Sequence, residues 1–189
     1  GGDTSTASSC TSDSLLINEV SGAAYNNTMP WFEIYNKGSS CALMSNFSVK
    51  SLSISTSDNL NNLSEARTFS LPSVELKSGG YMIIRGKYTT SNNITSSASF
   101  AEISDDSSYS PAWGYNGGFI EILKDGKTID FISFGTDTTS PTSSDGWTGS
   151  AAPKPVFWST YSKSIARDST SSDTNSSSDW TQRTFGTFG

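Results

Sequence analysis

Short runs of apolar residues, separated by turn-forming residues, make up most of the chain. The run 31–36 alternates with a period of two, and 15–20 is rich in β-branched and apolar residues, as strands are. Comparable runs follow at 47–54, 68–71 and 81–85. No stretch carries the apolar stripe of a helix longer than a turn or two. The pattern therefore predicts an all-β protein built from many short strands.

The clearest local signal is a hairpin in the second half of the chain. Two alternating runs, 119–124 and 127–134, are separated only by Asp125 and Gly126. An Asp-Gly pair at this position favours a type I′ turn, in which both central residues have positive φ. We therefore expect a two-residue β-hairpin here.

The run 47–54 alternates, but its phase changes partway along. Phe47 and Val49 occupy odd positions, whereas Leu52 and Ile54 occupy even ones. A shift of one residue within a strand is what a β-bulge produces. Two short strands with a break between them are the alternative.

Polar segments without periodicity flank and interrupt these runs. Residues 1–13 are small and polar and predict a flexible lead-in or tether, which leaves 14–189 as a single domain. The stretches 55–65 and 86–117 are long for connections and predict polar loop insertions with structure or function of their own. Residues 168–179 are nearly all Ser, Thr, Asp and Asn.

Composition excludes several classes of function. The 189 residues include no histidine, so a His-based triad or a His-ligated zinc site cannot form within the chain. The formal net charge of −6 argues against a nucleic-acid surface, which needs a basic patch. No apolar run approaches the roughly 20 residues that cross a bilayer. A chain of this length buries enough surface to fold without a metal or cofactor, and we expect none.

The two cysteines, Cys10 and Cys41, are too few for a four-thiolate site. In an acidic, Ser/Thr-rich chain they suggest a disulfide and export to an oxidising, extracellular compartment. The closed loop would hold about 30 residues, which the chain-entropy model converts to roughly 3–4 kcal/mol. Two unrelated free thiols are the alternative.

The order of several motifs resembles that of the bacterial lamin tail domains, over about residues 15–185. The motifs lie at 16–20, 31–36, 41–49, 76–84, 125–131, 163–167 and 173–180. Two features depart from that family: the insertions are long, and Thr184-Phe185-Gly186 stands where Thr-Pro-Gly is usual.

The resemblance implies an immunoglobulin-like β-sandwich and a non-catalytic, exported or surface-tethered interaction module. Its partner would be a protein or glycan of the cell envelope or host matrix, and the N-terminal segment would space it from a lipid anchor or a preceding domain. The sequence leaves the oligomeric state open. The alternatives are an accessory domain of an extracellular nuclease or glycosidase, and a calcium-stabilised adhesion domain.

Aromatic residues in or beside loops are the candidate ligand-binding residues, because their flat faces suit sugar rings and protein partners. They are Trp113, Tyr115, Trp147, Trp158 and Tyr161. The alternative is that they are buried anchors for the loops, since tryptophan is highly buried on average.

Two sets of acidic residues suggest other chemistry. Asp173, Asn175 and Asp179 offer oxygen ligands for calcium, but they lack the glycine and closing glutamate of an EF-hand loop. A solvated turn segment tied down by Trp180 is the alternative. Glu19 and Glu33 would form a carboxylate pair if their strands are neighbours. Such a pair could serve glycoside hydrolysis. The simpler alternative is that the two carboxylates hydrogen-bond to turn backbone or face lysine and arginine side chains.

Overall fold

The computed structural model describes residues 9–21, 31–54, 66–86, 96–97, 99–103, 117–155 and 164–183, and strands dominate these ranges. The all-β class expected from the sequence is confirmed. The strands are β1 (Leu15–Ser21), β2 (Trp31–Asn36), β3 (Ala42–Leu43), β4 (Ser48–Ile54), β5 (Arg67–Ser70), β6 (Glu75–Leu76), β7 (Tyr81–Gly86), β8 (Ser96–Ser97), β9 (Phe100–Ile103), β10 (Gly117–Lys124), β11 (Lys127–Gly135), β12 (Ser164–Ala166) and β13 (Thr181–Arg183). Two 3-10 turns, η1 (Met44–Asn46) and η3 (Ser177–Asp179), lie between them. Within these ranges no helix has the length and apolar character to span a membrane.

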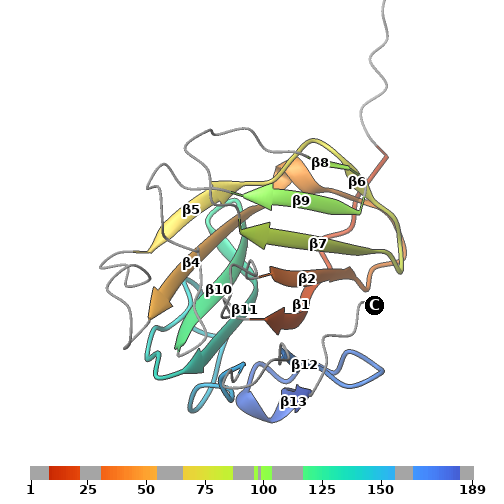
Figure 1. Ribbon diagram of the computed structural model, residues 1–189. Coiled ribbons are helices and arrows are strands. Elements are labelled where there is room, and N and C mark those ends of the chain that lie inside the picture. The colour runs from red at the N-terminus through yellow and green to blue at the C-terminus, as the bar shows by residue number, and fades with distance from the viewer. Residues whose placement is uncertain are drawn as a thin grey trace, which may run out of the picture.

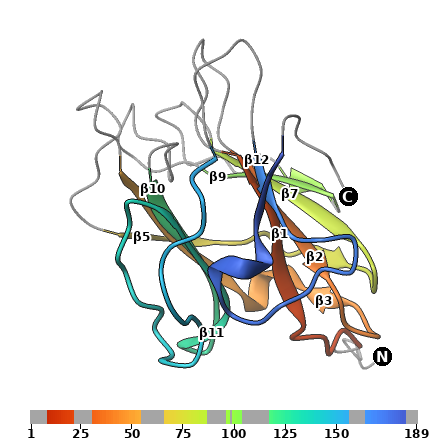
Figure 2. The same cartoon turned by 90° about the horizontal axis from the view of Figure 1, so that it is seen from below.

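The strands form two larger sheets and one small one (Figure 1). The seven-stranded sheet has the order β13-β12-β1-β2-β7-β9-β8, and the four-stranded sheet has the order β11-β10-β4-β5. Neighbouring strands are antiparallel except for β7 and β9. Figure 2 shows the two larger sheets on opposite sides of the molecule, with β12 beside β1.

A single hydrophobic core joins the two larger sheets. Ile17 and Phe32 contribute from the seven-stranded sheet, and Val49, Ile120 and Ile132 contribute from the other, all with no exposed surface. Each such aliphatic or aromatic side chain stabilises the fold by about 1.5–3 kcal/mol through burial. The alternation of Phe32 and Ile34 in β2 follows from this arrangement, because one face of that strand meets the core.

A second apolar layer covers the opposite face of the four-stranded sheet. Phe119 and Phe131 lie on that face and stack with their ring centroids 5.6 Å apart. Trp147, from the segment that follows β11, meets Phe131 edge-on at 5.8 Å. The segment after β11 therefore folds back over the sheet instead of extending into solvent.

The predicted bulge in the run 47–54 is wrong. Strand β4 pairs with β10 in unbroken register from Ser48 to Ile54. Ser51 takes the inward position and is fully buried, whereas Leu52 lies opposite Phe119 on the other face. The change of phase therefore records apolar layers on both faces of β4. The register shifts that do occur lie in β1, between Ile17 and Glu19, and in the β10–β11 pair.

The predicted hairpin between β10 and β11 is confirmed. Lys124 pairs with Lys127, so the loop contains only two residues. Asp125 and Gly126 have φ values of 51° and 73°. Both are positive, as a type I′ turn requires.

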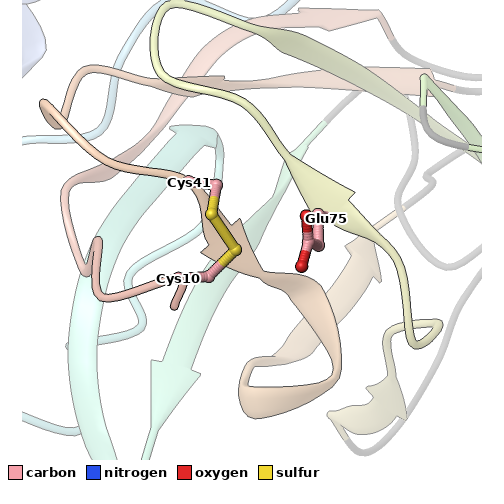
Figure 3. Close-up of side chains that lie close together, drawn as sticks. All are labelled: Cys10, Cys41 and Glu75. Carbon is pink, nitrogen blue, oxygen red and sulfur yellow. A yellow bond between two sulfur atoms is a disulfide. The ribbon is translucent and has the colours of Figure 1, made fainter. Parts of the chain in front are cut away.

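The predicted disulfide between Cys10 and Cys41 is also present, with a Cα–Cα distance of 4.5 Å. It joins the segment before β1 to the residue before β3, and the Glu75 carboxylate lies beside it (Figure 3). A disulfide is compatible with an extracellular location.

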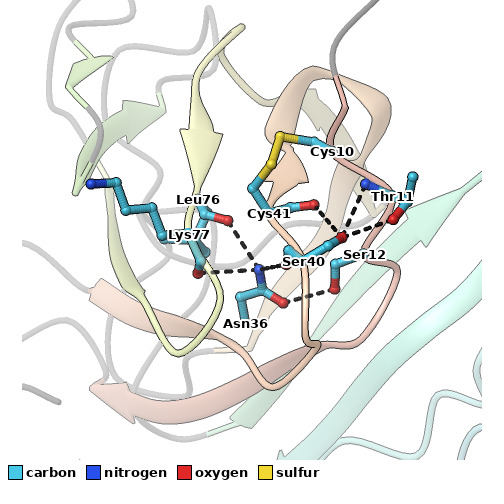
Figure 4. The surroundings of a disulfide bond; sticks show 8 residues. All are labelled: Cys10, Thr11, Ser12, Asn36, Ser40, Cys41, Leu76 and Lys77. Atoms are coloured by element: carbon cyan, nitrogen blue, oxygen red, sulfur yellow. Dashed lines mark hydrogen bonds between the residues drawn. A yellow bond between two sulfur atoms is a disulfide. The ribbon is translucent and has the colours of Figure 1, made fainter.

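Asn36, at the end of β2, holds three loops together next to the disulfide (Figure 4). Its side-chain amide donates to the carbonyls of Ser40, Leu76 and Lys77 at 2.9–3.2 Å. Its Oδ1 accepts from the Ser12 hydroxyl at 2.8 Å. The residue is fully buried. Its amide gives these carbonyls the hydrogen bonds that they would otherwise have made to water.

Substitution of Gly38 by alanine tests how closely these loops approach. A Cβ at Gly38 would lie 2.0 Å from the Ser12 Oγ and 2.9 Å from its Cβ, so the N-terminal segment has to move. We expect Gly38→Ala to lower the free energy of unfolding by about 1–3 kcal/mol, measured by urea denaturation. In the double variant with Ser12→Gly, the loss should be smaller than the sum of the two single losses. An unchanged midpoint for Gly38→Ala would contradict the close approach.

Candidate functional site

Of the five candidate aromatic residues, the structure describes only Trp147; Trp113, Tyr115, Trp158 and Tyr161 lie outside the described residues. Trp147 is 9% exposed, and its ring rests on Phe131. Its indole Nε1 is buried and finds no acceptor in the described part of the chain. Trp147 therefore anchors its loop to the sheet, and at the same time it lines the opening described next.

An open cleft of about 560 Å³ lies within the segment that covers the four-stranded sheet. This volume is within the range of small-molecule sites. Its lining comes from the end of β11 and from the loop that follows: Ser133, Gly135, Thr136, Asp137, Thr138, Thr139, Ser140, Pro141, Trp147, Gly149, Ser150 and Ala151. Of these described residues, half carry a hydroxyl group, and there is one carboxylate and one indole among them.

Buried carboxylates hold the walls of the cleft in place. Glu121, on β10, accepts from the backbone N–H and hydroxyl of Thr142 at 2.7 and 3.0 Å and from the Thr128 hydroxyl at 2.6 Å. Thr128 and Ser143 also exchange backbone-to-hydroxyl bonds of 2.8 and 3.0 Å. These bonds link the loop to both strands of the hairpin, so the cleft is preorganised.

Asp137, a lining residue of the cleft, holds the turn that follows β11. One of its oxygens accepts from the Ser133 hydroxyl at 2.6 Å, and the two oxygens accept from the backbone and hydroxyl of Thr139 at 3.1 and 2.8 Å. The side chain is buried. Asp137 is thus engaged in fixing the turn after β11.

Four hydroxyl groups of the cleft have no such engagement. Thr136, Thr138, Ser140 and Ser150 are exposed, and within the described residues their side chains make no hydrogen bond. A hydroxyl both donates and accepts. The cleft therefore presents a set of neutral donors and acceptors beside the indole of Trp147.

A buried arginine lies where β1, of the seven-stranded sheet, approaches β11, of the four-stranded sheet; this contact is called the seam. Arg167, which follows β12, donates through Nε to the carbonyl of Ile17 at 2.8 Å and through Nη2 to both oxygens of Asp130 at 3.1 Å. Its Nη1 lies 3.2 Å from Asp173 and 3.4 Å from Asp179. The side chains of Arg167 and Asp130 are each 1% exposed. Asp168, the next residue along the chain, instead accepts from the backbone of Thr170 and the hydroxyl of Ser172.

Asp130 is a buried acid whose titration should affect stability. Burial raises its pKa to about 6, against the opposing influence of Arg167 and of the backbone amides of Ile17 and Phe131. A carboxyl with a pKa raised above the unfolded value of about 3.9 binds more protons in the folded state. Its contribution to the free energy of unfolding is therefore complete below pH 4 and is lost as the pH rises through 6.

We expect this dependence to disappear in Asp130→Asn. The stability advantage of the parent over the variant should shrink by about 1–3 kcal/mol between pH 4 and pH 7, measured by chemical denaturation at each pH. Asp168→Asn is the matched comparison. Hydrogen bonds from Ser172 and Thr170 hold the pKa of Asp168 below its usual range, so its contribution is instead lost as the pH falls below 4. Parallel pH profiles for the parent and Asp130→Asn would contradict the assignment.

The calcium candidates lie in the segment that carries this arginine contact. Asp173 and Asp179 face the Arg167 guanidinium, and Asp179 also accepts from the backbone and hydroxyl of Thr174 at 2.8 and 2.7 Å. Asn175 donates to the carbonyl of Asp145 at 3.3 Å, and its own carbonyl accepts from Thr148. Asp173 and Asp179 therefore already have donors within the chain, and they share the Arg167 guanidinium with Asp130.

Removal of calcium by a chelator tests whether this segment binds the ion. A ligand that binds only the folded state raises the melting temperature, and removing it lowers that temperature. Because Asp173 and Asp179 already accept hydrogen bonds from groups of the chain, we expect EDTA and added CaCl₂ to leave the melting temperature unchanged within about 1 °C. A calcium-dependent rise that Asp173→Asn abolishes would instead assign the site to the metal.

Glu19 and Glu33 lie directly opposite each other on β1 and β2, and both are 1% exposed. The Ser164 hydroxyl donates to Glu19, and the Asn18 amide donates to Glu33 at 2.9 Å. Both carboxylates therefore take part in the packing of the seven-stranded sheet, and neither lines the cleft beside Trp147.

Among the described residues, one group of acidic and sulfur ligands is close enough to hold a metal ion: Cys10, Cys41 and Glu75 (Figure 3). Its two sulfur atoms are joined in the disulfide. Because a cysteine binds a metal ion as a free thiolate, neither sulfur atom is available as a ligand. The group is therefore a cross-link and not a metal centre.

A scan of the chain against protein-family models and a search of curated proteins found no match.

Proposed function

We propose that the chain is a non-catalytic, exported or surface-tethered module that binds a protein or glycan of the cell envelope or host matrix through its loops. The observation that carries this proposal is the cleft beside Trp147, whose loop is braced from beneath while four of its hydroxyls are unengaged. Preorganised polar groups around a cleft favour binding, because little conformational entropy is lost when a ligand arrives.

The surroundings of the cleft favour binding over catalysis. General acid–base chemistry needs a carboxyl or another titrating group within reach of the substrate. Asp137 is the one carboxylate in the part of the lining that the structure describes, and hydrogen bonds from Ser133 and Thr139 already occupy it. Glu121 is committed to Thr142 and Thr128 beneath the loop.

The family proposal is an immunoglobulin-type β-sandwich of the lamin tail kind. Two sheets with one shared core are what such a sandwich requires. The motifs that resemble the family coincide with β1, β2, the β6–β7 step and the β10–β11 hairpin. The disulfide supports export. Because it holds Cys10 against the domain, the part of residues 1–13 that precedes Cys10 would act as the spacer from an anchor or another domain.

A binding screen against glycans and matrix proteins tests the proposal. The parent should bind at least one member of the panel, and Trp147→Ala should lose that binding. Because Trp147 also anchors the loop, near-UV circular dichroism has to accompany the variant, with the double variant Thr138→Val/Ser140→Ala as a second probe of the cleft. Trp113→Ala and Trp158→Ala examine the remaining tryptophans proposed for binding. Turnover of any substrate, or undiminished binding in all these variants, would overturn the proposal.

A further inference from the structure

We infer that the cleft beside Trp147 takes an uncharged saccharide and discriminates against sulfated and uronic acid-containing glycans. This inference rests on the proposed binding function and specifies its ligand. It is carried by the hydroxyl groups of the described lining and by the Asp137 carboxylate, the one charged side chain among those residues.

The unengaged groups match the chemistry of sugar hydroxyls. Thr136, Thr138, Ser140 and Ser150 each offer one donor and two acceptor positions on a short side chain. Saccharide hydroxyls have the same dual character, so each can donate to one protein hydroxyl and accept from another. The indole of Trp147, with Pro141 and Ala151, supplies the apolar part of the lining that the C–H faces of a sugar ring require.

The lining is a poor match for a protein partner. Protein interfaces depend on large anchors, mostly Trp, Tyr or Arg, that enter a pocket on the partner. Trp147 is 9% exposed and held against Phe131, so it cannot project into a partner. The exposed groups around it are small and hydroxylated. A glycan is therefore the occupant that the cleft favours.

The charge of the cleft sets the specificity. Among the described residues that line it there is no lysine or arginine, and the one ionisable side chain in that set is Asp137. A sulfate or uronate entering the cleft would lose water without gaining a cationic partner, and it would face a buried carboxylate. The chain as a whole carries a formal charge of −6, which further opposes the approach of polyanions.

The test uses the full chain and pairs of probes that differ only in charge. Dextran, cellulose oligomers and mannan would each be compared with the sulfated counterpart by titration calorimetry at low and physiological salt. We expect at least one neutral probe to bind and its sulfated partner to bind at least about tenfold more weakly. Thr138→Val and Ser140→Ala should each weaken the neutral probe by about 3- to 10-fold, the usual effect of one hydrogen bond. Thr181→Val, an exposed position on β13, is the matched control and should bind as the parent does.

A charge added to the cleft gives a second readout that does not depend on loss of folding. Ser150→Lys should raise the affinity for the sulfated probe and narrow or reverse the preference. Binding of sulfated and neutral probes with equal affinity, or binding of matrix proteins alone, would overturn the saccharide inference and leave the proposed binding function standing. Absence of binding to glycans and matrix proteins alike would overturn both.

Discussion

Replacing Arg167 with methionine is expected to lower the free energy of unfolding by about 3–5 kcal/mol, the cost of breaking a buried ion pair by removing one partner. Methionine retains much of the apolar stem but none of the donors. Asp130, which is 1% exposed, would then be a buried carboxylate without its counter-charge. The carbonyl of Ile17 would also lose the donor that lies 2.8 Å away.

Chemical denaturation measures this loss, and two further variants identify its cause. The double variant Arg167→Met/Asp130→Asn should be more stable than Arg167→Met alone, because no uncompensated carboxylate remains. Lys37→Met is the control, since its ammonium donates to the carbonyl of Ser171 in the same segment but is exposed. It should cost less than about 1 kcal/mol. If Arg167→Met were no more destabilising than Lys37→Met, the seam would not depend on the buried pair.

The effect is expected to be large because the buried guanidinium of Arg167 joins three parts of the chain at one point. Its contacts reach Ile17 on β1, Asp130 on β11, and Asp173 and Asp179 in the segment before β13. The guanidinium also lies 4.8 Å from the centre of the Trp180 ring, which covers it from the outside. The same contacts order a segment whose composition suggests flexibility, because Ser, Thr and Asp side chains hydrogen-bond to backbone groups within it.

The strands could be predicted from the sequence because their signals are local. The period of two at 31–36 becomes β2 with those limits, and Asp125-Gly126 forms the expected turn. The run 47–54 shows where this reasoning fails. Its change of phase has a tertiary cause, since Leu52 lies opposite Phe119 and packs against the core on the second face of β4. Periodicity measures which face is buried, and it becomes ambiguous when both faces are covered.

The candidate site could be predicted only in part, because its geometry depends on distant partners. Trp147 was identified as a loop aromatic, but its burial against Phe131 follows from the way the loop folds over the sheet. Asp130 and Arg167 are 37 residues apart, and no spacing rule connects them. One signal was present: an aspartate within the apolar run 127–134 needs a partner if the strand is buried. The hydroxyls of the cleft carry no signal in a chain so rich in Ser and Thr.

Removal of the disulfide is expected to have the other large effect. Cys10 and Cys41 are 31 residues apart, and the chain-entropy model gives a loss of about 3–4 kcal/mol in Cys10→Ala/Cys41→Ala. The folded state should change little. Ser12 donates to the carbonyl of Cys41 at 3.0 Å, and Thr11 contacts the Ser40 hydroxyl at 2.8 Å, so the segment remains docked without the covalent link (Figure 4).

The stabilisation therefore acts mainly through the unfolded chain, and denaturant titrations can show this. Without the cross-link the unfolded chain expands and exposes more surface, so the dependence of the free energy on denaturant should become steeper while the midpoint falls. Ser40→Ala, which removes the hydrogen bonds to Thr11 but keeps the disulfide, should cost only about 1 kcal/mol and leave that dependence unchanged. Equal midpoints for the parent and the cysteine-free variant would contradict this account. A midpoint that falls without any steepening would place the effect in the folded state, where the disulfide would be holding the N-terminal segment against the loops around Asn36.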